Sequence, residues 1–193
     1  MIPRRLFTVW MGDAMPPLVQ HCIATQAALE GYEHRVVTET NHGCDSRYLR
    51  EAIEARRWCK ASDYLRIWLL EREGGIYLDA DIEVVGTFDD MLVHAMFAGS
   101  EQNGWISNAV LGSEPHTPLL RRQLEIVDAN FIGSGDLVLE TGMYPFNALV
   151  RSVGGIVVYD PEYFHPYDHM TGNIVRTDNT RTYHHFMLSW AGQ

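Results

Sequence analysis

The pattern of hydrophobic and polar residues predicts short strands alternating with helices. Residues 6–10 are rich in aromatic and β-branched side chains and predict a first strand. A helix is expected from Pro16-Pro17, because apolar residues then recur at helical spacing until Gly31, a plausible end. Residues 34–38 predict a second strand. This β-α-β beginning is typical of an open α/β sheet with a parallel core, whose ligands bind beyond the carboxyl ends of the strands.

A long helical region follows, from about residue 46 to 73, and its second half is apolar on almost all sides. Such a helix is expected to be buried. Its charged residues Asp63 and Arg66 are three positions apart and therefore neighbours on one face. We expect them to line a cleft, although a purely structural ion pair is the alternative. Gly74-Gly75 predicts the end of this helix.

The rest of the chain continues the α/β pattern and then loses it. Further strands are predicted at 97–99, 109–111 and 156–159, and helices at 118–129 and 141–150. From residue 160 onward no periodicity is visible. No repeat, linker or low-complexity segment interrupts the chain. We therefore predict one domain over residues 1–193, with a mixed, mostly parallel sheet flanked by helices.

Composition narrows the class of function. The 193 residues suffice for one domain with its own core. The formal net charge of −10 argues against a nucleic-acid-binding protein, which usually carries a basic stripe. An acidic protein can still bind an anionic small molecule if a metal ion or a few arginines supply positive charge. Lys60 is the only lysine, so a catalytic lysine has one candidate.

The cysteines and the hydrophobic segments bear on location. Cys22, Cys44 and Cys59 are odd in number and widely spaced, which predicts neither a disulfide framework nor a structural zinc site. No apolar run is long enough for a signal peptide or a transmembrane segment. These features predict a soluble, cytoplasmic protein with ordinary thiols.

The most informative segment is residues 75–85, where a predicted buried strand leads into Asp79-Ala-Asp81. Side chains of extended chain alternate, so Asp79 and Asp81 are expected to point to the same side. An Asp-x-Asp pair alone is a weak signal and could be a solvated acidic turn. The preceding strand and the upstream Asp63 and Arg66 strengthen it.

Two histidines near the end of the sequence, His184 and His185, complete a set of candidate ligands. Carboxylates with an imidazole suit a divalent cation such as Mn²⁺, whereas Ca²⁺ prefers oxygen ligands alone. A metal with an arginine nearby can bind a diphosphate and stabilise charge on a phosphate leaving group. His165 and His169 are four apart, but Pro166 interrupts a helical frame, so we interpret them as loop residues.

These motifs, in order, resemble the DXD-containing sugar-transferring proteins of glycosyltransferase family 32, which include capsular polysaccharide synthesis enzymes and initiation-specific mannosyltransferases. The resemblance rests on residues 2–12, 60–66, 74–81 and 184–190. It implies a GT-A fold, a nucleotide-sugar donor and a divalent metal, usually Mn²⁺ but also Mg²⁺. It further implies transfer with retention of anomeric configuration. UDP-sugars are favoured over GDP-sugars, and the acceptor is a glycan, a lipid-linked molecule or a protein.

The resemblance also implies roles for single residues. Asp81 would bind the metal directly, and Asp79 would contact the metal and the ribose. Asp63 would hold the ribose or base, and Ser62 beside it is a further donor-binding residue. Arg66 would face the diphosphate or the donor sugar, and Trp10 would lie beside the base, although a core position for Trp10 is the alternative. One of His184 and His185 would complete the metal or diphosphate contacts. Further donor and acceptor contacts are implied for Asn108, Glu140, Thr141, Gly142, Ser189 and Trp190.

The mechanism is less defined by the sequence. No pair of general base and nucleophile stands out, which suits a retaining transfer in which the leaving phosphate takes the acceptor proton. Glu140 is kept as an alternative nucleophile or base. Two other functions remain open. One is an aspartyl phosphohydrolase, which also uses a strand ending in Asp-x-Asp, and the other is an inactive module that binds a nucleotide sugar or a glycan.

Overall fold

The structure is a computed structural model that describes residues 1–12, 14–129, 142–168 and 170–187. Its strands are β1 (Arg5–Val9), β2 (Glu33–Val37), β3 (Gly75–Leu78), β4 (Ile82–Val84), β5 (Met96–Ser100), β6 (Ile106–Ser113), β7 (Val157–Tyr159) and β8 (Thr182–His184). Its helices are α1 (Pro17–Ala27), α2 (Arg47–Glu54), α3 (Trp58–Glu73), α4 (Pro118–Ala129), α6 (Met143–Val153) and α7 (Pro161–Phe164).

Most strands of the described part of the chain form one six-stranded sheet, in the order β2-β1-β3-β6-β5-β7. The pairs β1–β2, β1–β3 and β5–β7 are parallel, whereas β6 runs antiparallel to both β3 and β5. Strands β4 and β8 form a separate antiparallel pair. The predicted α/β class with a mixed, mostly parallel sheet is confirmed.

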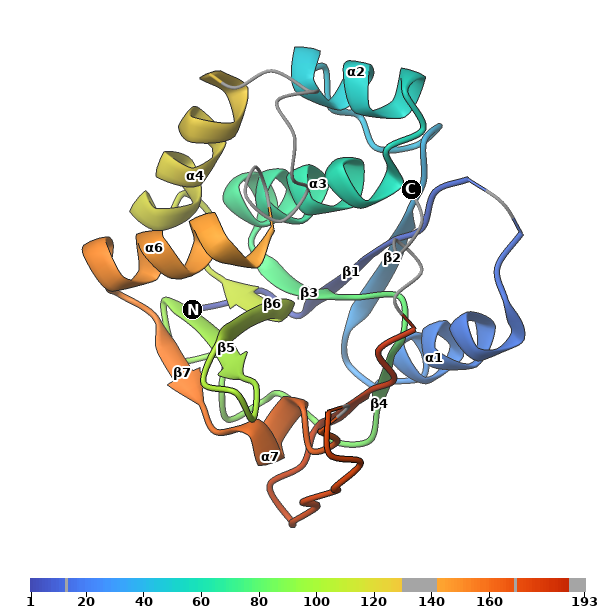
Figure 1. Cartoon of the computed structure of the whole chain (residues 1–193), viewed down its shortest axis with the longest axis vertical. Helices are drawn as coiled ribbons and strands as arrows, with labels where there is room; N and C mark the ends of the chain where they lie inside the picture. Colours follow the sequence, from blue (N-terminus) through green and yellow to red (C-terminus); the bar gives the residue numbers. More distant parts are fainter. Residues whose placement is uncertain (13, 130–141, 169, 188–193) are drawn as a thin grey trace.

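Helices cover both faces of this sheet, as Figure 1 shows. Helices α2, α3, α4 and α6 lie on one side, where Phe7 and Tyr77 point into a large apolar core. Helix α1 and the short α7 lie on the other side, where Leu6 and Ile76 belong to a second core. Neighbouring strand residues thus alternate between the two cores, as the pleat of a strand requires. This alternation directs Tyr77 toward α3.

The end of α3 sets where the central strand begins. Gly74 and Gly75 have φ angles of 63° and 130°, which side chains other than glycine rarely adopt. A Cβ atom on Gly75 would lie 2.8 Å from the Arg5 carbonyl oxygen. The pair therefore ends the helix, as the sequence predicted, and the structure adds that it brings β3 directly against β1.

Two predictions at the element level differ from the structure. Helix α1 ends at Ala27 rather than at Gly31, because the chain turns toward β2 earlier. The region after residue 160, where no periodicity was visible, contains α7 and β8. Both are too short, at four and three residues, to show a repeating pattern. Among the described helices, none is long and apolar enough to cross a membrane.

Candidate metal centre

The Asp-x-Asp motif occupies a tight turn at the carboxyl end of β3. The strand ends at Leu78, and the Ile82 amide donates to the Asp79 carbonyl at 3.0 Å. The expected extended alternation through Asp79 and Asp81 is therefore wrong, because a turn separates β3 from β4. The turn nevertheless brings the two carboxylates together, since an oxygen of each lies within 4.8 Å of the other and of a His184 nitrogen.

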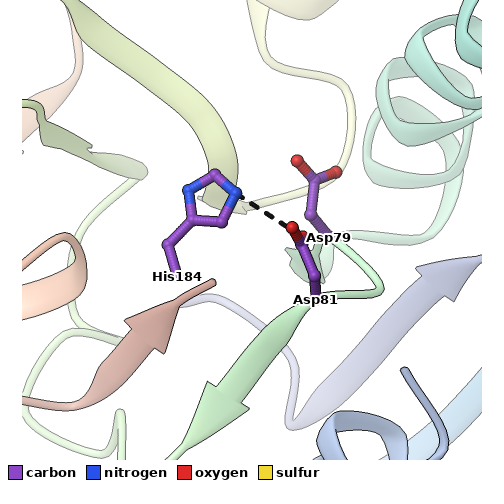
Figure 2. A group of neighbouring side chains, drawn as sticks. All are labelled: Asp79, Asp81 and His184. Atoms are coloured by element: carbon purple, nitrogen blue, oxygen red, sulfur yellow. Dashed lines mark ion pairs between the residues drawn. The ribbon is translucent and has the colours of Figure 1, made fainter. Parts of the chain in front are cut away.

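Figure 2 shows how Asp79, Asp81 and His184 converge. The Nε2 atom of His184 lies 3.5 Å from Oδ1 of Asp81. His184 arrives on β8, which pairs with β4 so that His184 lies opposite Ile82. Two segments about one hundred residues apart in the sequence thus meet at one edge. The side chains of Asp81 and His184 are only 15% and 11% exposed, so both are partly desolvated.

Helix α3 contributes two buried charged residues, Asp63 and Arg66, next to this cluster. Arg66 Nη2 lies 2.9 Å from Asp79 Oδ1 and 3.0 Å from Asp63 Oδ1. Its Nη1 donates to the Asn108 carbonyl at 3.0 Å, and the guanidinium lies 4.6 Å from the centre of the Tyr77 ring. The side chains of Arg66 and Asp63 are 7% and 8% exposed. The structural ion pair that the sequence left as the alternative is present, and it extends to the Asp-x-Asp motif.

Tyr77 joins the same network and was not singled out in the sequence. Its hydroxyl donates to Asp79 Oδ1 at 2.8 Å and lies 3.1 Å from the Ser62 hydroxyl. The signal was available, because Tyr77 precedes Asp79 by two residues and shares its side of the strand. Arg66 and Tyr77 thus hold Oδ1 of Asp79 in place.

Asp81 is held by backbone amides of the C-terminal segment. The Met187 amide donates to Asp81 Oδ2 at 2.8 Å, and the His185 amide donates to the Asp81 carbonyl at 3.2 Å. Burial raises the pKa of the Asp81 carboxyl, but His184 and the Met187 amide outweigh it and hold this pKa below its ordinary value. Asp81 is therefore ionised at neutral pH.

The pKa values of Asp79 and His184 shift upward. For Asp79, burial raises the pKa, Arg66 opposes that effect, and the neighbouring Asp81 raises it further. For His184, burial lowers the pKa, but Asp81 and Asp79 more than compensate, so the imidazole holds its proton more tightly than usual. In this cluster the positive charges of Arg66 and His184 are thus shared among the carboxylates of Asp63, Asp79 and Asp81.

The remaining predicted site residues lie at or near this edge. Trp10 follows β1, whose carboxyl end lies at the same edge as that of the parallel β3. Asn108 lies in β6 beside the turn, since the Asp79 amide donates to the adjacent Ala109 carbonyl at 2.8 Å. The Asn108 side chain is buried, and its Nδ2 has no hydrogen-bond partner among the described residues.

His185 does not join the cluster. Its Nε2 lies 3.0 Å from Oε2 of Glu83, which also lies 3.6 Å from His21 through its other oxygen. Of the two histidines left open by the sequence, the structure brings His184 to the carboxylates. Gly142 precedes helix α6. Predictions for Glu140, Thr141, Ser189 and Trp190 concern residues outside the described part of the chain.

Part of the sequence is similar to a known protein family. Residues 13–98 match the family model for the glycosyltransferase sugar-binding region containing DXD motif. The matched segment contains Asp63, Arg66, Asp79 and Asp81, but not His184. The match covers less than half of the 193-residue chain and shows that this segment is similar to that region. No curated protein matches the sequence.

Several solved structures share the fold. The PaToxG glycosyltransferase has a TM-score of 0.68 at 17% identity, with 80% of this chain and 71% of that chain covered. The UDP-bound glycosyltransferase domain from the YGT toxin has a TM-score of 0.57 at 9% identity, covering 81% and 79%. A glycosyltransferase involved in the glycosylation of the major capsid of PBCV-1 has a TM-score of 0.51 at 13% identity, covering 98% and 96%. At these identities the likeness concerns the fold, and the predicted GT-A fold class is confirmed.

Proposed function

We propose that this protein is a metal-dependent glycosyltransferase that moves a sugar from a nucleotide-diphosphate sugar to an acceptor hydroxyl. One observation carries the proposal: two carboxylates and an imidazole from distant segments converge at the carboxyl edge of the sheet. Two of the three belong to the segment that matches the DXD family model. Ligands of open α/β sheets bind at this edge. Membership of glycosyltransferase family 32 and a single domain over residues 1–193 are parts of the same proposal.

The cluster fits a divalent cation by charge and by donor type. Asp63, Asp79 and Asp81 carry three negative charges, and Arg66 supplies one positive charge. The two remaining negative charges would be balanced by a divalent cation bound to neutral His184. Two carboxylate oxygens and one imidazole nitrogen suit Mn²⁺, with Mg²⁺ as the second candidate. When bound, such a cation supplies positive charge to a departing diphosphate.

The protein residues around the cluster would fix the ligands. Arg66 and Tyr77 hold Oδ1 of Asp79, while the Met187 amide holds Oδ2 of Asp81. In this arrangement Arg66 orients Asp79 from below, so a direct contact of Arg66 with the diphosphate stays a prediction. The unpartnered Nδ2 of Asn108 could donate to an oxygen of the donor sugar or phosphate. These groups would bind and orient the donor before transfer.

The nucleotide, the acceptor and the stereochemistry of the transfer are parts of the same proposal. UDP is the first nucleotide to test, because one of the similar structures has UDP bound. The predicted acceptors are a glycan, a lipid-linked molecule or a protein, as in polysaccharide biosynthesis. We retain the prediction that configuration is kept and that the departing phosphate takes the proton of the acceptor hydroxyl. Glu140 stays an alternative nucleophile or base.

The experiment is a donor panel. The purified protein is incubated with UDP-sugars and GDP-mannose, with Mn²⁺ or with EDTA, and release of the nucleoside diphosphate is measured. We expect Mn²⁺-dependent release from one donor, loss of that release in Asp81→Asn, and near-normal release in Glu83→Gln. Glu83 is a matched control because it lies two residues from Asp81 but contacts His185 and His21 instead.

Two outcomes would overturn the proposal in favour of a specific alternative. Binding of a donor in calorimetry with no release under any condition would indicate a nucleotide-sugar-binding module. Hydrolysis of a generic phosphomonoester that is lost in Asp79→Asn would indicate an aspartyl phosphohydrolase.

A further inference from the structure

A second histidine lies directly behind the metal centre. His165 follows helix α7 and is 1% exposed. Neither of its ring nitrogens has a hydrogen-bond partner among the described residues. A neutral imidazole offers one N–H donor and one nitrogen lone pair that can accept a hydrogen bond. Buried polar groups are nearly always satisfied, so this one calls for an explanation.

One ring nitrogen of His184 also lacks a hydrogen-bond partner among the described residues. Its Nε2 faces Asp81, whereas its Nδ1 is buried and has no partner among the described residues. A histidine that binds metal through one nitrogen normally donates the N–H of the other to an acceptor, which fixes the tautomer and the ring orientation. If Nε2 binds the metal, Nδ1 must carry the proton and needs an acceptor.

The two rings are close enough to supply this bond. Their centroids are 5.3 Å apart, with an angle of 54° between the ring planes. Two imidazoles joined by one N–H···N bond of ordinary length have centroids about 5 Å apart. A half-turn of the His165 ring exchanges its carbon and nitrogen positions within the same plane and leaves Nε2 of His184 facing Asp81. A bond between the rings therefore requires rotation and no change in their spacing.

The described surroundings keep the two rings together. The Phe186 ring stacks on His184 with centroids 3.8 Å apart and lies 6.3 Å from His165. On the other side of His165, a Cβ atom added to Gly99 would lie 3.3 Å from the His165 ring. The Thr182 hydroxyl donates to the Phe164 carbonyl at 2.9 Å, which ties the residue before His165 to the strand that carries His184.

We infer that His165 is a positioning residue of the metal centre, which accepts the Nδ1–H of His184 and so presents Nε2 of His184 to the metal. This inference rests on the proposed metal site and deepens it. His165 would not itself touch the metal or the donor. Its remaining nitrogen could be satisfied by a buried water, the usual partner of such an atom.

The test compares Mn²⁺ affinity, measured by electron paramagnetic resonance in the absence of donor. His165→Phe retains an aromatic ring in the buried position but removes both nitrogens. We expect roughly 10- to 100-fold weaker Mn²⁺ binding, as for loss of other partners of metal-binding histidines. The matched control is His94→Phe, which removes a histidine hydrogen bonded to Tyr159 at 2.9 Å away from the cluster, and should leave the affinity unchanged. His165→Asn or His165→Gln should restore part of the affinity, since an amide oxygen can accept the bond.

A spectroscopic readout on the wild-type protein covers the case in which His165→Phe does not fold. In ¹⁵N-histidine-labelled protein saturated with Mg²⁺, His184 should carry its proton on Nδ1, and His165 should show the nitrogen shift of a hydrogen-bond acceptor. A His184 protonated on Nε2 would overturn the inference, as would wild-type Mn²⁺ affinity in His165→Phe.

The outcomes separate this inference from the proposed function. If the wild-type protein binds Mn²⁺ but turns over no donor, the glycosyltransferase proposal fails and the role of His165 is still decided by its variants. If donor turnover is normal and His165→Phe binds Mn²⁺ as wild type does, only the inference fails. If the wild-type protein binds no Mn²⁺, the metal centre and the inference fail together.

Discussion

The carboxylate of Asp79 lies between the buried guanidinium of Arg66 and the other two members of the metal centre, Asp81 and His184. Arg66 and Tyr77 both contact Oδ1, so Oδ2 is the oxygen left for a metal. A carboxylate in partial burial is costly unless it is paired and hydrogen bonded. The network therefore both stabilises the charge of Asp79 and restricts the rotation of its side chain.

Replacing Tyr77 by phenylalanine should weaken metal binding. The ring and its contact with the Arg66 guanidinium remain, but the hydrogen bond to Asp79 is lost. We expect about tenfold weaker Mn²⁺ binding, because loss of groups that orient a ligand has effects of this size. The control is Tyr64→Phe, which removes an equivalent buried bond of 2.9 Å to Asp128 on the far side of α3. Both variants should lose about 1–3 kcal/mol of stability to urea, and only Tyr77→Phe should lose affinity. Equal affinities in the two variants would contradict the role of Tyr77.

Metal affinity should depend on pH through His184. In the metal-free protein the pKa of His184 is raised above its ordinary value of 6.5 by its carboxylate neighbours. Below that raised pKa a proton occupies the imidazole and must leave before the metal binds. Affinity should therefore fall roughly tenfold per pH unit below this pKa and level off above it. Calorimetry at several pH values in buffers of different ionisation enthalpy would count the proton released. No proton release at pH 6 would contradict the assignment of His184 as a ligand.

At the level of single residues, the sequence indicated the carboxylates and left the histidine open. Asp79, Asp81, Asp63 and Arg66 stand out because charged residues in apolar surroundings are unusual. His184 is the last residue of β8 and His185 follows it, and only the pairing of β8 with β4 decides which one faces Asp81. The sequence around residue 165 gives no sign of that partner, so His165 was interpreted as a loop residue.

The turn between β3 and β4 is held by elements on three sides. Helix α1 contributes Gln26, whose Nε2 donates to the Ile82 carbonyl at 2.8 Å and to the Asp79 carbonyl at 3.2 Å. Its Oε1 accepts from the Thr8 hydroxyl of β1. Strand β6 and the segment after β8 complete the support through Ala109 and His185. The geometry of the metal centre is thus a property of several elements together.

Substituting Gln26 tests this support. Gln26→Leu keeps the volume but removes the hydrogen bonds of Gln26 to the Ile82 and Asp79 carbonyls and from the Thr8 hydroxyl, and we expect a loss of about 2–4 kcal/mol of stability. Gln123→Leu is a matched control, since Gln123 is also buried but its amide has no partner in the described part of the chain. That change should be neutral or stabilising. Urea denaturation with Mn²⁺ titration would show whether Gln26→Leu also weakens metal binding, as we expect. Equal stability of the two variants would contradict the role of Gln26.

Long, periodic elements were predictable from the sequence, and short ones were not. Helices α3 and α4 and the first β-α-β unit follow from spacing and from glycine positions. Strand β8 has three residues, and its formation depends on a partner one hundred residues earlier. Such a pairing is decided by tertiary contacts, which a local pattern does not contain.

At the scale of the whole molecule, the acidic net charge bears on how the site could bind a diphosphate. A chain with a net charge of −10 is poorly suited to attract a diphosphate unless positive charge is supplied locally. The described cluster has an excess of carboxylates over cations, so a divalent cation would neutralise the local negative charge at this edge of the sheet. The fold class could be predicted from the sequence because the order of elements and the motif agree. The donor sugar and acceptor could not, because they depend on side chains that carry no recurrent pattern.

The most direct test of the metal centre is anomalous diffraction from crystals grown with Mn²⁺ and UDP. We predict one strong manganese peak in contact with Asp79, Asp81 and Nε2 of His184, with the UDP diphosphate bound to the same ion. The peak should be absent in Asp81→Asn crystals grown in the same way. A manganese ion bound elsewhere, or UDP bound with no metal at these residues, would contradict the account.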